Sequence, residues 1–197
     1  MNIPAWLKTL PDEALRGLEL REWHDNEVDA YVELLNKHHY LKCPHARKRH
    51  LSQVACYQGK AVALIIWTTS SRKLIHRDEY IGWDSRTREK RLSWIVQNNR
   101  FLLLPQDRPV NLASRILGLS IKALPDAWEA RYGKRPLLAE TFVDPEAYKG
   151  TCYQAAGWSR LGQTKGFARV SAPQYYQDND RPKHLWVRPL AKDALER

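Results

Sequence analysis

The sequence predicts a single α+β domain with a mixed, mostly antiparallel central sheet, flanking helices and a charged helical insertion. The chain has 197 residues and 43% of them are hydrophobic, which suits one domain with a substantial core. Runs rich in apolar and β-branched residues, typical of strands, are interspersed with segments of helical spacing. One charged stretch, residues 70–100, interrupts this order. We therefore expect one domain over residues 1–197, with the charged stretch inserted in it.

The N-terminal part is predicted to contain a strand, a helix and a β-hairpin. Alternating residues at 18–23 indicate the strand, and apolar positions at helical spacing over residues 28–35 indicate the helix. Two more strands, at residues 52–57 and 61–69, flank a turn at residues 58–60. The second of these, AVALIIWTT, is almost continuously apolar, as expected of a central buried strand.

Residues 70–100 combine dense charge with two tryptophans, and the run RTREKRLSWIV within them is predicted to be helical. Basic residues interleaved with aromatic rings are typical of nucleic-acid grooves, where cations contact phosphates and rings stack on bases. We therefore expect Arg77, Trp83 and Arg100 to contact nucleic acid. The cluster at residues 76–79, His-Arg-Asp-Glu, has two interpretations, a catalytic group or a salt-bridged loop, and its spacing indicates the loop.

Next, a buried strand is predicted at residues 101–104 and a helix at residues 112–123, with Asn111 as its N-cap. Pro125 is expected to break this helix, because proline lacks the N–H group that a helix needs. A short helix is expected between this proline and Gly133, whose missing side chain suits a helix end.

The stretch LLAETFVDPEAYKGTCYQAAGW organises the C-terminal half. Residues 137–144 are predicted to form a strand, so Glu140 and Asp144 share one face with apolar neighbours. Two carboxylates on such a face are unusual. A short helix at residues 148–156 is expected to end at Gly157. Two further strands are expected at residues 158–167 and 184–190.

The net charge of +10 is unevenly distributed. Residues 1–30 contain three basic and seven acidic residues, so the remainder carries about +14. Such asymmetry favours a polyanionic partner, most simply nucleic acid, over a merely basic surface.

The loop KCPHARKRH, residues 42–50, is a dense basic cluster. We expect Arg47, Lys48 and Arg49 to contact phosphates. Cys43, His45 and His50, together with His38 or His39, also suggest metal ligands, but their spacing matches no zinc module, so no metal site is predicted.

The three cysteines are scattered and odd in number, which argues against a disulfide framework. The first residues lack the pattern of a signal peptide, and no apolar run reaches the roughly 18 residues of a membrane span. We therefore expect a cytoplasmic location.

The order of these elements resembles the GNAT acyltransferase fold, and YQAAGW is similar to the YEKAGF ending common in those enzymes. GNAT enzymes hold the pyrophosphate of acetyl-CoA on a glycine-rich turn where the long helix begins. The corresponding turn here, QDRPVNLAS, has no glycine, and Pro109 removes one N–H donor. The resemblance thus implies an acyl-CoA-type donor but the phosphate turn is absent, so the cofactor stays unknown. Arg108 and Asn111 are expected to contact a donor phosphate.

The sequence resembles the DruA family more specifically. The matching segments, in order, are HHYL, RDEYIGW, NNRFLLLP, NLAS, WEARYG, ETFVD, GTCYQAAGW and LGQTKG, which cover most of residues 38–166. The resemblance implies an anti-phage defence or mobile-element setting, a DNA-related role, and partners among the proteins of a defence or transposition system.

Three functions follow. The first is a GNAT-like transferase that modifies DNA or RNA bases, with Glu140 as the base and Asp144, Tyr153 and Asp78 assisting. The resemblance gives Tyr153 the role of general acid. The alternative role of Glu140 is structural, as the buried partner of an arginine such as Arg100 or Arg115.

The second function is a non-catalytic DNA-binding module, whose cofactor site has been lost. The third is a metal-dependent nuclease that uses Asp78, Glu140 and Asp144 with Mg²⁺. Glu140 and Asp144 lie four strand residues apart, roughly 13 Å, so they cannot share one ion. Asp78 would have to converge with one of them.

Overall fold

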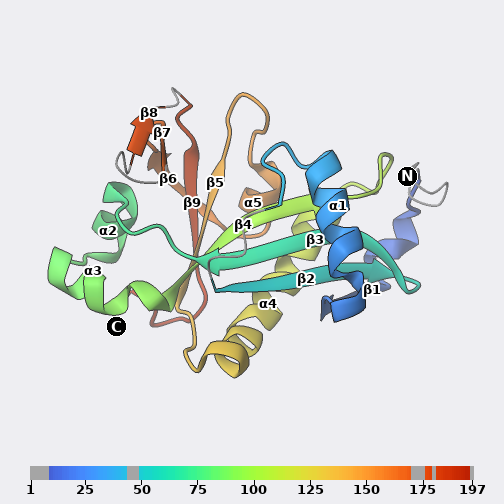
Figure 1. Cartoon of the computed structure of the whole chain (residues 1–197), viewed down its shortest axis with the longest axis horizontal. Coiled ribbons are helices and arrows are strands. Elements are labelled where there is room, and N and C mark those ends of the chain that lie inside the picture. The colour runs from blue at the N-terminus through green and yellow to red at the C-terminus, as the bar shows by residue number, and fades with distance from the viewer. Residues whose placement is uncertain (1–8, 44–48, 170–175, 179–180, 196–197) are drawn as a thin grey trace.

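The computed structural model describes residues 9–43, 49–169, 176–178 and 181–195. Seven strands form one sheet in the order β1-β2-β3-β4-β5-β9-β6, and all neighbours are antiparallel except β4 and β5 (Figure 1). This confirms the predicted mixed, mostly antiparallel sheet. The strands are β1 (Leu18–Glu22), β2 (His50–Tyr57), β3 (Lys60–Thr69), β4 (Ile95–Leu103), β5 (Leu138–Val143), β6 (Ser159–Gln163) and β9 (His184–Pro189), with a separate pair β7 (Phe167–Arg169) and β8 (Tyr176–Asp178). The helices are α1 (Val28–His38), α2 (Ile75–Ile81), α3 (Ser85–Arg91), α4 (Leu112–Tyr132) and α5 (Thr151–Ala155).

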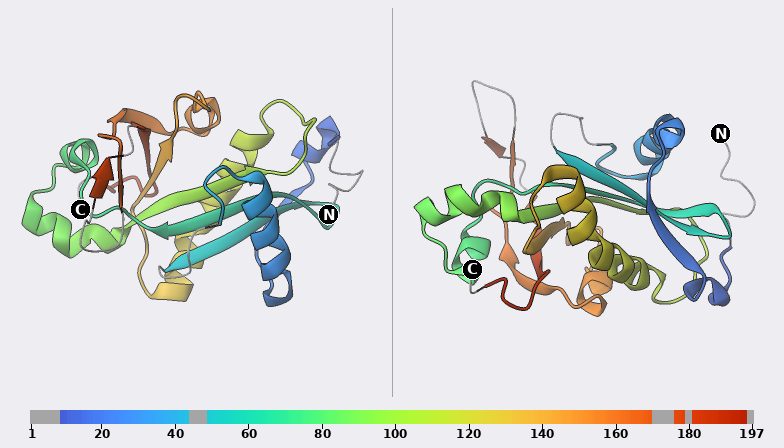
Figure 2. Two further views of the ribbon diagram at one scale, coloured as in Figure 1. Left: turned by 45° about the horizontal axis from the view of Figure 1, so that its top comes forward. Right: turned by 90° about the horizontal axis from the view of Figure 1, so that it is seen from below.

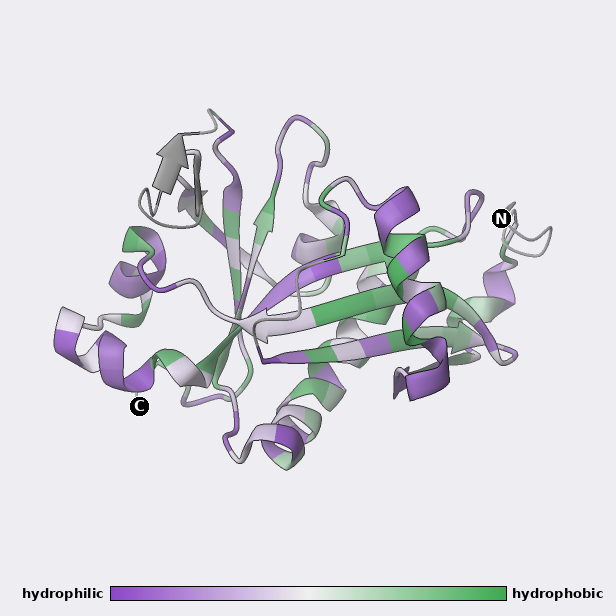
Figure 3. Cartoon of the chain, viewed as in Figure 1, coloured by the Kyte–Doolittle hydropathy of each residue, from purple (hydrophilic) through white to green (hydrophobic). Residues whose placement is uncertain are grey.

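Helices α1 and α4 cover opposite faces of the sheet (Figure 2). The face toward α4 buries alternate residues of β2 and β3, including Leu51 and Trp67, against Ile116 of the helix. The face toward α1 buries the residues between them, such as Leu64, against Leu35. Both faces of β3 are therefore apolar, which explains its continuous hydrophobic sequence (Figure 3).

The predicted hairpin of β2 and β3 is confirmed. Gln58 and Gly59 at its turn have φ values of 50° and 73°. Two successive positive φ angles define the type I′ turn, whose twist matches that of the strands it joins. Strand β2 begins at His50, two residues earlier than expected.

Two of the expected helix boundaries were wrong. Helix α4 continues through Pro125 to Tyr132, although the proline costs a backbone hydrogen bond. Leu124, Pro125 and Trp128 are all buried, so packing on the sheet compensates for the lost bond. Helix α5 begins only at Thr151.

The charged segment also ends sooner than expected. Its helical part consists of α2 and α3, and the run RTREKRLSWIV is α-helical only as far as Arg91. From Ile95 the chain belongs to β4, so residues 95–100 lie in the middle of the sheet. Ile95 and Val96 are buried on opposite faces of the sheet, which fixes them as strand rather than helix.

In the part of the chain that the structure describes, no helix has the length and hydrophobicity to span a membrane.

The parallel pairing of β4 and β5 is short. It covers four residue pairs, from Ile95↔Leu138 to Asn98↔Thr141, and the strands then diverge (Figure 1). The pairing of β4 with β3 is irregular at the same place, since Trp67 pairs with Asn98 while Ile66 pairs with Arg100. The extra residue bends β4 away from β5, because a bulge adds a local kink to its strand. This divergence creates the candidate site.

Gly150, just before α5, cannot accept a side chain. Its φ is 76°, and a Cβ atom there would lie 2.7 Å from the ring of Trp186. We expect Gly150→Ala to lower the free energy of unfolding by more than about 2 kcal/mol, because overpacking adds to the backbone strain. The matched control is Gly59→Ala, where φ is 73° and nothing lies within 4 Å, so only about 1 kcal/mol is expected. Urea denaturation of both variants tests this, and equal losses would contradict it.

Candidate functional site in the cleft between β4 and β5

A cleft of about 810 Å³ opens where β4 and β5 diverge. Five segments line it: the end of α1, the outer part of β4, the start of α4, the end of β5, and the loop that leads into α5. Four of the residues expected in a site meet here. They are Arg108, Asn111, Asp144 and Tyr153.

The floor of the cleft is a hydrogen-bonded polar group. The Tyr153 hydroxyl donates to Asn98 Oδ1 over 2.8 Å, and Thr141 Oγ1 donates to the Asn98 carbonyl over 3.0 Å. Burial raises the pKa of Tyr153 well above its ordinary value. Tyr153 therefore keeps its proton at neutral pH, and in this structure its hydroxyl hydrogen is directed at Asn98 Oδ1.

Asp144 is the acidic group among the described residues that line the cleft. It directly follows β5 and is 6% exposed. Its Oδ1 accepts a hydrogen bond from the Glu146 amide over 3.0 Å, which holds the carboxylate in place. Oδ2 has no hydrogen-bond partner in the described part of the chain, so it is free to contact a ligand in the cleft.

The start of α4 offers backbone donors to an anion. Asn111 is the N-cap with a φ of 71°, but its side chain does not cap the helix. The Leu112 amide bonds to the Pro109 carbonyl, whereas the amides of Ala113 and Ser114 have no acceptor among the described residues. Two open amides at the positive end of a 21-residue helix can bind one anionic group. Arg108 also lines the cleft, and its guanidinium donates to the Pro105 carbonyl over 2.9 Å.

Arg100 of β4 binds the segment that follows α1, at the side of the cleft. Its guanidinium donates to the carbonyls of Leu41 and Lys42 and to Asn99. Arg100 pairs with no carboxylate in the described residues, so it is not the arginine partner that the alternative role of Glu140 required. The same contacts restrict its reach to a nucleic acid. Burial, together with Arg100 and Lys183, lowers the pKa of His39 to about 4, so His39 is neutral at physiological pH.

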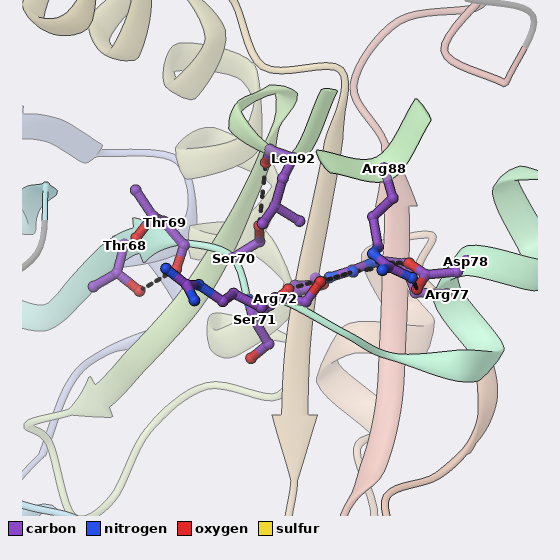
Figure 4. Close-up of polar contacts among 10 residues, drawn as sticks. Thr68, Thr69, Ser70, Ser71, Arg72, Arg77, Asp78, Arg88 and Leu92 are labelled. Carbon is purple, nitrogen blue, oxygen red and sulfur yellow. Dashed lines mark hydrogen bonds and ion pairs between the residues drawn. The ribbon is translucent and has the colours of Figure 1, made fainter. Parts of the chain in front are cut away.

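Glu140 lies outside the cleft, in a buried ionic network. Its side chain is fully buried, and its two oxygens accept from the Ser71 amide and Arg77 Nη1, each over 2.8 Å. Arg77 also binds Asp78 through Nε and Nη2, and Arg88 of α3 completes the network on the other Asp78 oxygen over 3.2 Å (Figure 4). Burial raises the pKa of Glu140, while Arg77 and the Ser71 amide oppose that rise.

This network corrects three expectations. Arg77 is fully buried and cannot reach a nucleic acid. Glu140 is the buried partner of an arginine, its alternative role, with Arg77 in place of Arg100 or Arg115. Asp78 and Glu140 do converge, as the nuclease hypothesis requires, but Arg77 occupies the space between them where a cation would bind.

The other expected nucleic-acid contacts are dispersed. Trp83 packs against the core cluster around Ile95, where its ring is partly covered. Arg49 is exposed, with its guanidinium 5.5 Å from the centre of the Tyr132 ring. Arg47 and Lys48 lie outside the described residues, so their role stays a prediction.

Several residues of the cleft were not predicted from the sequence as part of this site. His39, Tyr40 and Tyr148 line its opening, and Asn98 and Thr141 form its floor. Residues 38–41 and 98–105 do fall in segments shared with the DruA family, which was the available signal, but nothing in their spacing indicated a common cavity.

The architecture and the split between β4 and β5 define a protein of the GNAT acetyltransferase fold. The aminoglycoside acetyltransferase AAC(6')-Ib, solved with ribostamycin and coenzyme A, is similar with a TM-score of 0.58 and 15% identity, over 92% of this chain and 97% of that chain. A GNAT family acetyltransferase from Streptococcus pneumoniae gives 0.52 and 15%, over 87% and 99%. The ribosomal-protein-S18-alanine N-acetyltransferase from Escherichia coli gives 0.50 and 9%, over 88% and 94%. At such identities the likeness shows the fold alone.

The family model for Druantia protein DruA matches residues 14–194. The chain therefore belongs to the defence-associated DruA family, as the shared segments indicated. No curated protein matches the sequence significantly.

Proposed function

We propose that this chain is a group transferase that binds its donor in the cleft between β4 and β5 and modifies the bases of DNA or RNA. The observation that carries the proposal is the cleft itself, which brings together three features. They are the protonated hydroxyl of Tyr153, the free Oδ2 of Asp144, and the backbone amides at the start of α4 that have no acceptor among the described residues. These are a proton donor, a proton acceptor and an anion site, which are the groups that transfer to an amine requires.

Asp144 and Tyr153 have opposite roles in this proposal. Asp144 Oδ2 accepts the proton that an acceptor amine loses as its nitrogen bonds to the transferred group. The Tyr153 hydroxyl donates a proton to the atom that leaves, and solvent then returns the proton from Asp144 to Tyr153. Asn98 and Thr141 hold Tyr153 in position.

An acyl-CoA-type donor fits the start of α4 only in part. The turn has no glycine, and Pro109 has no N–H, so the Ala113 and Ser114 amides would hold one phosphate with help from Arg108. Such a donor would supply an activated acyl group.

The charges around the cleft favour an anionic acceptor. Four basic side chains lie in the lining of the cleft or at its rim: Arg100, Arg108, Lys149 and Lys183. Asp144 provides the single carboxylate among the described residues of the lining. A polycationic acceptor, such as the aminoglycoside in the AAC(6')-Ib structure, would be repelled here. The net charge of +10 points to nucleic acid, and the DruA family suggests a setting of anti-phage defence or transposition with partner proteins.

The test is nucleoside mass spectrometry on DNA and RNA from cells that express the chain together with the proteins of its defence system. Asp144→Asn removes the proposed base but keeps an oxygen that can accept the hydrogen bond from the Glu146 amide. Glu146→Gln is the matched control, because it makes the same chemical change at an exposed neighbouring residue. We expect a new nucleoside mass with the wild type and the control, and none with Asp144→Asn. Unmodified nucleosides in all three would overturn the proposal and favour the non-catalytic DNA-binding module.

A further inference from the structure

Two exposed tyrosines flank the opening of the cleft. Tyr40 follows α1 and is 44% exposed, and Tyr148 lies between β5 and α5 and is 56% exposed. Their ring centres are 6.0 Å apart and their planes differ by 47°. Large aromatic rings that remain this exposed at the entrance of a cavity are suited to stack on a planar ligand.

Basic groups surround these rings. Lys183 Nζ lies 5.8 Å from the centre of the Tyr40 ring, and His39 stacks against the same ring with 5.1 Å between centres. His39 is neutral at physiological pH, so it supports Tyr40 without adding charge, while Lys183 and Arg100 make the rim cationic. Flat rings combined with cations suit a ligand with planar faces and negative charge, which is the chemistry of a nucleic-acid strand.

The depth of the proton-transferring groups restricts the form of that strand. Asp144 and Tyr153 are 6% and 8% exposed, so an acceptor atom must enter the cleft to reach them. A base stacked inside a duplex cannot do so, and enzymes that act on bases use single strands or extrude the base. An exposed ring at the entrance replaces the stacking that an unstacked base has lost.

We propose that the acceptor is a single-stranded nucleic acid, one base of which leaves its stack, rests on Tyr148 with Tyr40 as the adjoining wall, and enters the cleft. Lys183 and Lys149 contact the flanking phosphates. The inference rests on the proposed function for its identification of the reacting groups, but the binding mode can be tested without any turnover.

The test uses the full chain and a fluorescent single-stranded oligonucleotide that contains 2-aminopurine, with a duplex of the same sequence for comparison. We expect the single strand to bind at least about tenfold more tightly than the duplex. We also expect the Tyr148 ring to quench the emission of the bound 2-aminopurine, relative to the same unstacked base in the Tyr148→Ala complex. Tyr148→Ala should weaken single-strand binding about tenfold and abolish the quenching, whereas Tyr148→Phe should keep both. Ile75→Ala, on α2 and 50% exposed, is the control for the loss of an exposed apolar side chain and should bind like the wild type.

Equal affinity for duplex and single strand, or unchanged quenching in Tyr148→Ala, would overturn the inference. Circular dichroism confirms that each variant is folded. The outcomes separate the two proposals: stacking on Tyr148 with unmodified nucleosides contradicts only the transferase, and modified nucleosides without this stacking contradict only the binding mode.

Discussion

Replacing Arg77 with methionine is expected to lower the free energy of unfolding by about 3–5 kcal/mol. The substitution keeps an apolar stem of similar length but leaves the Asp78 and Glu140 carboxylates without the cation that they share. Removing one partner of a buried ion pair costs this much because the remaining charge stays buried and uncompensated. Urea denaturation, followed by the fluorescence of the eight tryptophans, measures the loss.

Arg88→Met is the matched control for this prediction. Arg88 reaches the network at its edge and contacts only the second Asp78 oxygen, over 3.2 Å, with 15% of its side chain exposed. Its loss should cost about 1 kcal/mol, as for a partly solvated pair. Arg77→Met combined with Glu140→Gln should lose less than the sum of the two single variants, because the two groups interact directly. A loss below about 1 kcal/mol for Arg77→Met would show that the network does not hold α2 to the sheet.

Tyr153→Phe is expected to reduce the yield of modified nucleoside by about 10²–10⁴-fold while the protein stays folded. The phenyl ring can keep the contacts with Trp158 and Trp186, whose ring centres lie 5.2 and 6.5 Å away. What disappears is the hydroxyl that would protonate the leaving atom, and general acid catalysis contributes a factor of this size. Nucleoside mass spectrometry over a time course of expression measures the change.

Thr141→Val separates proton donation from positioning. It removes the other hydroxyl that holds Asn98, with little change of shape, and leaves Tyr153 intact. We expect a loss of about 1 kcal/mol in stability, typical of one hydrogen bond, and activity within about tenfold of the wild type. If Thr141→Val lost as much activity as Tyr153→Phe, the tyrosine would serve only to position Asn98.

Local patterns were sufficient to predict much of the sheet. The hairpin of β2 and β3 follows from two apolar runs around Gln58-Gly59, and β5 from an apolar run bounded by prolines. In both places residues close together in the sequence determine the backbone conformation, so the strand can be predicted from the local sequence. Strand alternation placed Asp144 on the same face as Glu140, whereas in the structure Asp144 and Tyr153 line the cleft and Glu140 does not.

Contacts between distant residues could not be predicted in this way. Arg77 and Glu140 are 63 positions apart, and Arg77 is one of many arginines in a charged stretch. Residues 95–100 were assigned to the insertion because their charge and amides concealed a strand, and only pairing with β3 and β5 on both sides makes them central. Pro125 was expected to break α4, since local propensity does not record the burial that stabilises the helix across it.

Strand β9 is translated after β5 and β6, yet it lies between them and pairs with both. A nascent chain that has not yet released residues 184–189 from the ribosome therefore contains β5 with one edge open and β6 with no neighbour in the sheet. The hairpin layer from β1 to β4 needs nothing later in the chain for its pairing and can form first. The wall of the cleft that contains Asp144 and Tyr153 is consequently completed last, and a ribosome stalled before His184 would present an unpaired strand edge that is prone to association with other chains.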